Sequence, residues 1–138
     1  MQMDARCNEE FPAIKKGRNF GIFAVHGESL DVHEICPRGD FPTWQSFVER
    51  LPQNLCCHVF AHFKYTAESD GVERSKFVNI LWAPAGARGK DKMTITFFAE
   101  KTLMALGALG ACRLEAGSLA DLEEAVVREK ILRHVTVK

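Results

Sequence analysis

Residues 44–65 read WQSFVERLPQNLCCHVFAHFKY, and two different periodicities meet within this stretch. Its first half places apolar side chains at positions i, i+3, i+4 and i+7, which is the spacing of one helix face. Those side chains are Trp44, Phe47, Val48 and Leu51. Thr43 can cap such a helix and Pro52 can end it. The stretch therefore predicts a short amphipathic helix with its apolar face on the core.

The second half of the stretch, residues 55–65, is rich in side chains that favour β-structure. Alternate residues of a strand point to opposite faces of a sheet. One face would carry Cys57, Val59, Ala61, Phe63 and Tyr65. The other face would carry Cys56, His58, Phe60, His62 and Lys64. We therefore expect a strand directly after the helix.

A second apolar run follows, because residues 74–84 read RSKFVNILWAP, with two cations and a serine at the front. We expect residues 76–83 to form a strand that Pro84 closes. The intervening residues 66–73, TAESDGVE, have the Asp70-Gly71 pair of a turn. The two strands therefore predict an antiparallel hairpin with a long loop.

On the N-terminal side, residues 4–18 favour a helix, but Pro12 predicts that this helix is short or broken. Residues 19–25 and 29–35 read NFGIFAV and SLDVHEI. Both segments have the composition and alternation of strands, and Gly27 lies in the turn between them.

On the C-terminal side, residues 91–111 are ambiguous, because Met93, Ile95 and Phe97 alternate as in a strand while the second half reads as a helix. The closing residues 119–133 predict a helix with an apolar stripe. That stripe consists of Leu119, Leu122, Val126 and Ile131, after a possible capping box of Ser118 and Asp121. No repeat or linker divides the chain, so residues 1–138 are expected to form one domain.

The composition is that of an ordinary soluble globular protein, with 138 residues of which 46% are hydrophobic and 26% charged. No apolar run reaches the roughly 18–20 residues that cross a bilayer, so no membrane insertion is expected. The five cysteines have no CxxC spacing and the N-terminus is too charged for a secretory signal, which favours a reduced, cytoplasmic setting. They are Cys7, Cys36, Cys56, Cys57 and Cys112.

Eighteen basic and eighteen acidic residues give no net charge, which argues against a nucleic-acid partner. Residues 74–101 nevertheless carry a local charge of +4. The cations are Arg74, Lys76, Arg88, Lys90, Lys92 and Lys101, against Asp91 and Glu100. This clustering suggests an acidic partner; the alternative is that cations at strand ends only keep an edge solvated.

The cysteines and histidines of residues 56–62 resemble metal ligands in composition, but their spacing argues against a metal site. In a strand, His58 and His62 lie about 13 Å apart at roughly 3.3 Å per residue, so they cannot chelate one ion. No nucleophile elbow, phosphate-binding glycine loop or HExxH motif is present in the sequence. We therefore expect no metal, no cofactor and no enzymatic activity; a cytosolic thiol or metal enzyme remains the alternative from another class.

Two blocks together resemble the actin-depolymerising factor homology domain of the cofilin superfamily. Residues 44–65 resemble its aromatic-x-x-Phe-Val-x-x-Leu-Pro helix, cysteine and following strand. Residues 77–93, FVNILWAPAGARGKDKM, are similar to its strand, Trp-Ala-Pro turn and Lys-x-Lys-Met helix start. The resemblance covers residues 40–132 and implies an α/β fold: a central mixed sheet of about five strands between helices. It also implies that MTITF, residues 93–97, belongs to the first half of a long bent helix.

Within the superfamily, ERSKF, EKTL and the closing LADLEEAVVREKI resemble coactosin more than cofilin. This resemblance implies a monomeric binder of filamentous actin in the cytoplasm and cytoskeleton. By the coactosin match, Lys76 and the neighbouring Arg74 would contact the filament. By the cofilin match, Lys90, Lys92 and Met93 would contact actin.

Departures from the cofilin pattern bear on what the protein does to filaments. The start MQMDAR lacks the regulatory serine of cofilins, and TITFF and LMALGALG replace their lysine-rich helix. We therefore expect filament binding without strong severing. The alternatives are a severing and depolymerising factor of the cofilin type, and a regulator of the actin-branching complex like glia maturation factor.

Overall fold

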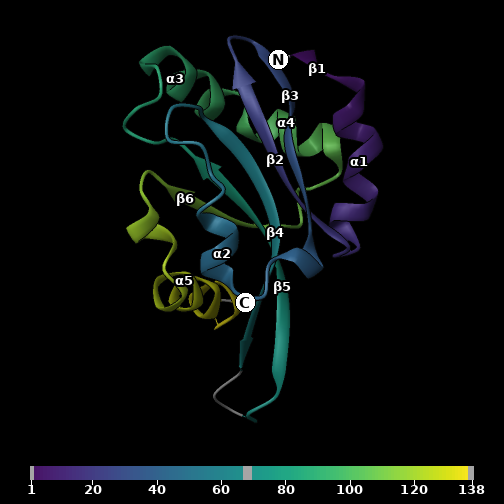
Figure 1. Cartoon of the computed structure of the whole chain (residues 1–138), viewed down its shortest axis with the longest axis vertical. Helices are drawn as coiled ribbons and strands as arrows, with labels where there is room; N and C mark the ends of the chain where they lie inside the picture. Colours follow the sequence, from purple (N-terminus) through teal and green to yellow (C-terminus); the bar gives the residue numbers. More distant parts are fainter. Residues whose placement is uncertain (1, 67–69, 137–138) are drawn as a thin grey trace.

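The predicted hairpin forms the centre of the sheet in the computed structural model, which describes residues 2–66 and 70–136 (Figure 1). Strands β4 (Cys57–Thr66) and β5 (Glu73–Trp82) pair antiparallel, from Cys57 opposite Trp82 to Thr66 opposite Glu73. Residues 67–69 of the expected turn lie outside the described residues. The alternation expected for β4 is confirmed, since the first set of side chains lies in one apolar cluster and Phe60 of the second set lies in the cluster on the other face.

Six strands were found where about five were expected, in the order β1-β3-β2-β4-β5-β6. The predicted pair β2 (Asn19–His26) and β3 (Ser29–Pro37) is antiparallel, and β2 also pairs antiparallel with β4. The two outer strands, β1 (Gln2–Met3) and β6 (Cys112–Ala116), each pair in parallel. The sheet is therefore mixed, as predicted.

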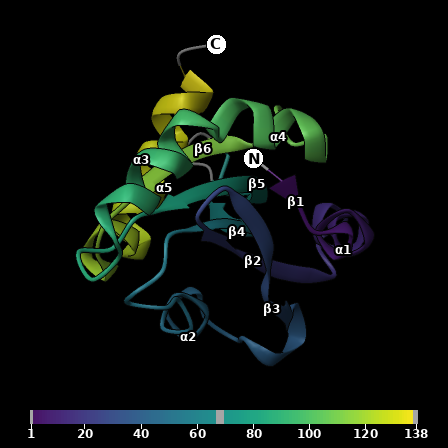
Figure 2. The same ribbon diagram turned by 90° about the horizontal axis from the view of Figure 1, so that it is seen from above.

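Helices cover both faces of this sheet, and Figure 2 shows α1 and α2 on different sides of it. The core of one face is formed with α1 (Ala5–Lys15), α3 (Gly89–Phe97) and α4 (Ala99–Leu106). On the other face, α2 (Trp44–Val48) and α5 (Glu124–Thr136) contribute to the core. The predicted α/β class is confirmed. Within the described residues, no helix is long and apolar enough to cross a membrane.

The predicted helix at residue 44 is present as α2. The Thr43 side chain accepts a hydrogen bond from the Ser46 amide at 3.1 Å, which completes its cap. Trp44 donates from Nε1 to the Leu122 carbonyl at 2.7 Å and so fixes α2 against the segment before α5. Short 3-10 turns, η1 (Arg38–Asp40) and η2 (Leu119–Leu122), precede α2 and α5.

The expectation of a short or broken first helix was wrong, because α1 runs continuously through Pro12. Its buried residues Cys7, Phe11 and Ile14 follow a helical spacing and pack on the sheet. Tertiary packing of this kind supplies most of the stability of a helix, so it outweighs the one hydrogen bond that proline removes.

The strand pattern at Met93, Ile95 and Phe97 was also misleading, since these residues lie in α3, as the family resemblance implied. Only Ile95 of the three is buried. The hydroxyls of Thr94 and Thr96 donate to carbonyls one turn back, which is how threonine is accommodated inside a helix. A break at Phe98 separates α3 from α4, so the expected long helix is bent.

The closing helix begins later than predicted. The box of Ser118 and Asp121 is present, but it caps η2, and α5 starts only at Glu124. As a result Val127 is fully buried in place of the predicted Val126.

Candidate functional site

The first group of predicted contact residues, Arg74 and Lys76, lies on the projecting half of the β4–β5 hairpin (Figure 1). This half projects because β2 pairs with β4 only as far as Phe60, and β6 pairs with β5 only from Val78 onward. Arg74 is paired with Asp70 at 2.5 Å, an exposed contact of small energy. Among the described residues, no carboxylate forms an ion pair with Lys76. We call Arg74 and Lys76 the hairpin cations.

The second group, Lys90, Lys92 and Met93, lies in the first turns of α3. The start of this helix is held by Asp91, which is buried and accepts a hydrogen bond from the Gly27 amide at 3.3 Å. Lys90 is exposed, Lys92 is half-buried, and the Met93 side chain is 75% exposed. The helix therefore presents a cation and an apolar side chain to solvent on a fixed base.

Phe97 belongs with this second group, and the sequence interpretation missed it. It is 79% exposed, more than any other large apolar residue described, and lies four residues after Met93. Residues at i and i+4 of a helix share a face, so reading residues 89–97 as a helix would have found this pair. We call Lys90, Met93 and Phe97 the α3 stripe. Exposed apolar side chains gathered on one face mark an interaction surface.

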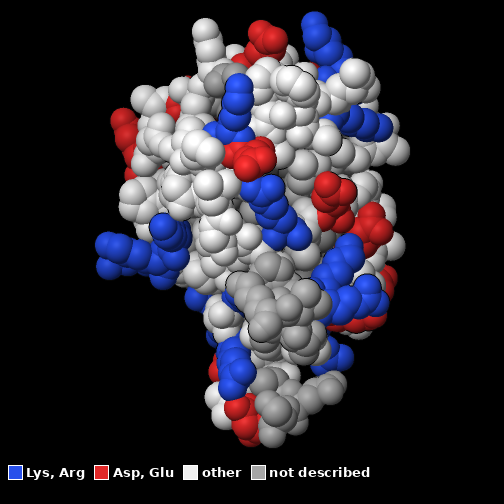
Figure 3. All heavy atoms as spheres, turned by 180° about the vertical axis from the view of Figure 1, so that it is seen from behind, with Lys and Arg blue, Asp and Glu red and all other residues white. Residues whose placement is uncertain are grey.

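The two groups do not form one patch. Six residues of β5, 77–82, lie between Lys76 and the inner end of the strand, which at about 3.3 Å per residue is roughly 20 Å, and α3 begins only after that end. On the face turned away in Figure 1, basic side chains are spread out with acidic ones between them (Figure 3). The molecule therefore offers two separate contact points, one on the projecting half of the hairpin and one on α3.

The cysteines show no sign of nucleophilic chemistry. All five are buried free thiols. Burial raises the pKa of Cys7 to about 11 and that of Cys36 to about 12, and it raises the pKa of Cys57 further. A reactive cysteine needs a lowered pKa, so the raised pKa values of Cys7, Cys36 and Cys57 do not favour nucleophilic chemistry at these thiols. The described part of the chain holds no cluster of three metal-ligating side chains.

His58 is a core residue with consequences for stability. Its ring is fully buried, and Asn79 Nδ2 lies 3.4 Å from Nδ1. Burial, together with the charge of Arg113, lowers the pKa of His58 to about 4. The folded protein therefore keeps this ring neutral at pH values where the unfolded chain, with an ordinary histidine pKa near 6.5, already binds a proton.

We expect the free energy of unfolding to fall as the pH drops from about 6.5 to about 4, by roughly 3 kcal/mol from His58 alone. The change His58→Phe should remove this part of the slope, whereas His33→Gln, at an exposed histidine, should keep it. Urea denaturation across this pH range measures the difference. Equal slopes in the two variants would show that His58 is not the titrating group.

The sequence matches one described family along nearly its whole length. The profile of the Cofilin/tropomyosin-type actin-binding protein family matches residues 1–132. Actophorin of Acanthamoeba castellanii is 28% identical over 131 residues, which cover 94% of this chain and 93% of that protein. Cofilin of Saccharomyces cerevisiae is 35% identical over 85 residues, covering 60% of this chain and 59% of the cofilin.

Solved structures share the fold at lower identity. Cofilin of Streptomyces griseoflavus superposes with a TM-score of 0.77 at 21% identity, over 96% of this chain and 97% of that one. Human coactosin-like protein superposes with a TM-score of 0.74 at 14% identity, over 96% and 98% of the two chains. Both therefore have the architecture described above.

Proposed function

Because the chain belongs to the cofilin and actin-depolymerising factor family of actin-binding proteins, we propose that it binds the sides of actin filaments without strongly severing them, as a coactosin-like protein. The observation that carries this proposal is the distance between the two contact groups. The hairpin cations lie on the projecting half of β5, and α3 begins beyond the other end of this strand, roughly 20 Å further along from Lys76. Two separated contact points suit a polymer, in which neighbouring subunits can be contacted together.

The chemistry of each group fits an acidic partner. Lys76 and Lys90 supply charge, and Met93 with Phe97 supplies the apolar contact. Charge complementarity chiefly raises the rate of association, and buried apolar anchors hold the complex. The proposed role requires neither a cofactor nor a catalytic group, and it places a monomeric protein on the cytoskeleton.

A second candidate is a severing and depolymerising factor. It is favoured by the names of the sequence relatives, which are cofilin and actophorin, and by the exposure of Met93 beside Lys90 on α3. The coactosins match in fold, so the measurement of filament length decides between the two candidates.

Exchange of Lys76 for alanine tests the hairpin end. We expect Lys76→Ala to raise the dissociation constant for filaments about tenfold, equivalent to about 1.4 kcal/mol. The effect should shrink as salt is added, because the Debye length is about 8 Å at physiological ionic strength. Lys16→Ala, at the exposed C-cap lysine that follows α1 and lies outside both groups, is the matched control. Co-sedimentation with preformed filaments measures both; equal binding by the two variants would remove the hairpin from the interface.

A further inference from the structure

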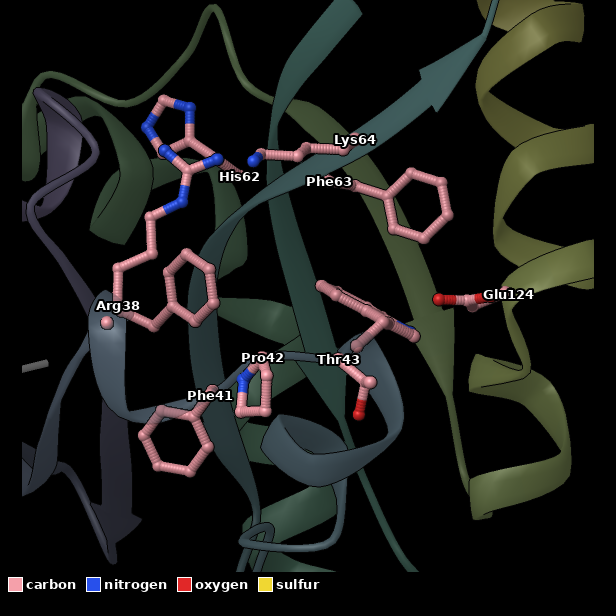
Figure 4. Close-up of a pocket in the computed structure, with 11 residues that line it drawn as sticks. Arg38, Phe41, Pro42, Thr43, His62, Phe63, Lys64 and Glu124 are labelled. Carbon is pink, nitrogen blue, oxygen red and sulfur yellow. The ribbon is translucent and has the colours of Figure 1, made fainter. Parts of the chain in front are cut away.

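A groove of about 530 Å³ opens beside the free part of β4 (Figure 4), and no residue of the α3 stripe lines it. It lies between β4 and the segment that joins β3 to α2. Its wall is basic at one end and aromatic along the middle. The lining side chains include Arg38, Phe41, Trp44, His62, Lys64 and Glu124. Cavities of this size commonly hold small organic ligands.

Three nitrogen-bearing side chains, Arg38, His62 and Lys64, converge at one end of the groove (Figure 4). Arg38 lies over the Phe20 ring at 5.9 Å and donates from Nη1 to the Gly17 carbonyl at 3.4 Å. No described acidic side chain forms an ion pair with Arg38 or Lys64. Like charges gathered without a counter-charge repel one another, and an anion placed between them would relieve this repulsion.

The acidic side chains nearby do not supply that counter-charge. Glu124 lines the opposite side of the groove, apart from the three convergent groups (Figure 4). Asp40 follows closely after Arg38 in η1 but does not line the groove. The basic end therefore stays open to an anion from solution.

The hydrogen bonds of His62 fix which of its ring nitrogens is free. Its Nε2 lies 3.2 Å from the Ile14 carbonyl oxygen and 3.1 Å from that of Lys15, at the end of α1. Carbonyl oxygens only accept, so Nε2 carries a hydrogen and donates. In the neutral ring Nδ1 is then bare, and it becomes a donor only when the ring takes up a proton.

We propose that this groove binds a phosphate ester, with the phosphate between Arg38, His62 and Lys64. The organic part of the ester lies against Phe41 and Trp44. Arginine and lysine are the side chains that best match a doubly charged oxyanion with several acceptor oxygens. The aromatic wall beside them selects an ester with a flat apolar group over inorganic phosphate.

Binding takes up a proton at His62. Burial lowers the pKa of His62, and the charge of Arg38 adds to the effect. Arg38 from η1 and Lys64 from β4, which line this end of the groove with His62, are both cations, whereas the Lys15 ammonium of α1 donates to the Gly107 carbonyl. From β5 the ring meets only uncharged Phe77, at 4.9 Å. A bound anion would place a negative charge beside the ring. This charge would raise the pKa of His62, so that the ring takes up a proton and Nδ1 donates a hydrogen bond to the anion.

Phenyl phosphate is the probe that tests the site. Trp44, one of two tryptophans, lines the groove, so its fluorescence reports binding, and calorimetry gives an independent dissociation constant. We expect saturable binding that weakens about tenfold or more in Arg38→Gln and in Lys64→Gln. Lys101→Gln, at an exposed lysine of α4 that does not line the groove, should bind as the unmodified protein does. Phenol should not bind, and inorganic phosphate should bind more weakly than its phenyl ester.

Phenyl sulfate tests the histidine, because its charge is constant whereas a phosphate monoester titrates near pH 6. Binding of phenyl sulfate should tighten as the pH falls from about 7.5 to about 5.5 in the unmodified protein and stay constant in His62→Gln. No saturable binding of phenyl phosphate, or equal binding by the arginine, lysine and control variants, would overturn the proposal.

A lipid headgroup could present the same phosphate chemistry. A second experiment, with vesicles, therefore distinguishes a lipid phosphate from a soluble ester. Pelleting with phosphatidylcholine vesicles is compared with and without phosphatidate. Vesicle binding that depends on Arg38, without saturation by phenyl phosphate, would assign the site to a membrane surface and overturn the small-ester proposal. None of these experiments contains actin, so these results are independent of filament binding.

Discussion

Replacing Trp82 with alanine should lower the free energy of unfolding by about 3–5 kcal/mol, the range for large aromatic side chains cut out of a core. Trp82 is the largest fully buried side chain and sits at the inner end of the central hairpin, opposite Cys57. Its Nε1 donates to the Pro52 carbonyl at 2.7 Å, which ties the loop after α2 to the sheet. Alanine would leave a cavity and also remove this bond. Since small domains are stable by only about 5–15 kcal/mol, much of the total would be lost.

The control for Trp82 is another aromatic truncated at the surface. Phe97→Ala should change the free energy of unfolding by no more than about 0.5 kcal/mol, because Phe97 is 79% exposed. Urea denaturation followed by circular dichroism measures both variants. If the two substitutions cost the same, the burial assigned to Trp82 is incorrect.

Removing one residue from each contact group should weaken filament binding far more than either change alone. We expect Lys76→Ala combined with Met93→Ala to raise the dissociation constant roughly 100-fold, about tenfold for each site. Lys76 lies in β5 on the projecting half of the hairpin and Met93 lies in α3, so their free-energy losses should add. Additivity is itself informative, since it indicates that both ends contact the filament in one complex.

A matched double variant controls for charge and residue type. Lys16→Ala combined with Met104→Ala removes one exposed lysine and one 60% exposed methionine outside both groups. It should bind filaments like the unmodified protein in the same co-sedimentation assay. A double variant of Lys76 and Met93 no weaker than Lys76→Ala alone would show that the α3 stripe does not touch the filament.

The parts of the fold that were predictable from sequence are those with strong local periodicity. The side chains of β4 alternate through ten residues, and both predicted faces were found in separate cores. The helix at Trp44 carries a cap, an apolar face and a terminating proline within a few residues. In both cases local preference and tertiary burial point to the same structure.

Elements that depend on contacts far apart in sequence were not predictable in this way. Strand β6 has only five residues, and it pairs in parallel with β5 across the intervening α3 and α4. In α3, β-branched residues favour a strand locally, but burial of Ile95 and the hydrogen bond that the Gly27 amide donates to the Asp91 carboxylate hold a helix. Because a strand places Phe97 on the same face as Ile95, the strand prediction did not reveal that Phe97 is exposed while Ile95 is buried.

High-speed co-sedimentation of the unmodified protein with preformed actin filaments, across a salt series and with filament length scored by microscopy, tests the central claim most directly. We predict that the protein pellets with filaments of unchanged length and that binding weakens as salt rises. Shortened filaments, or protein and actin left together in the supernatant, would contradict binding without severing. Absence of association even at low salt would contradict filament binding itself.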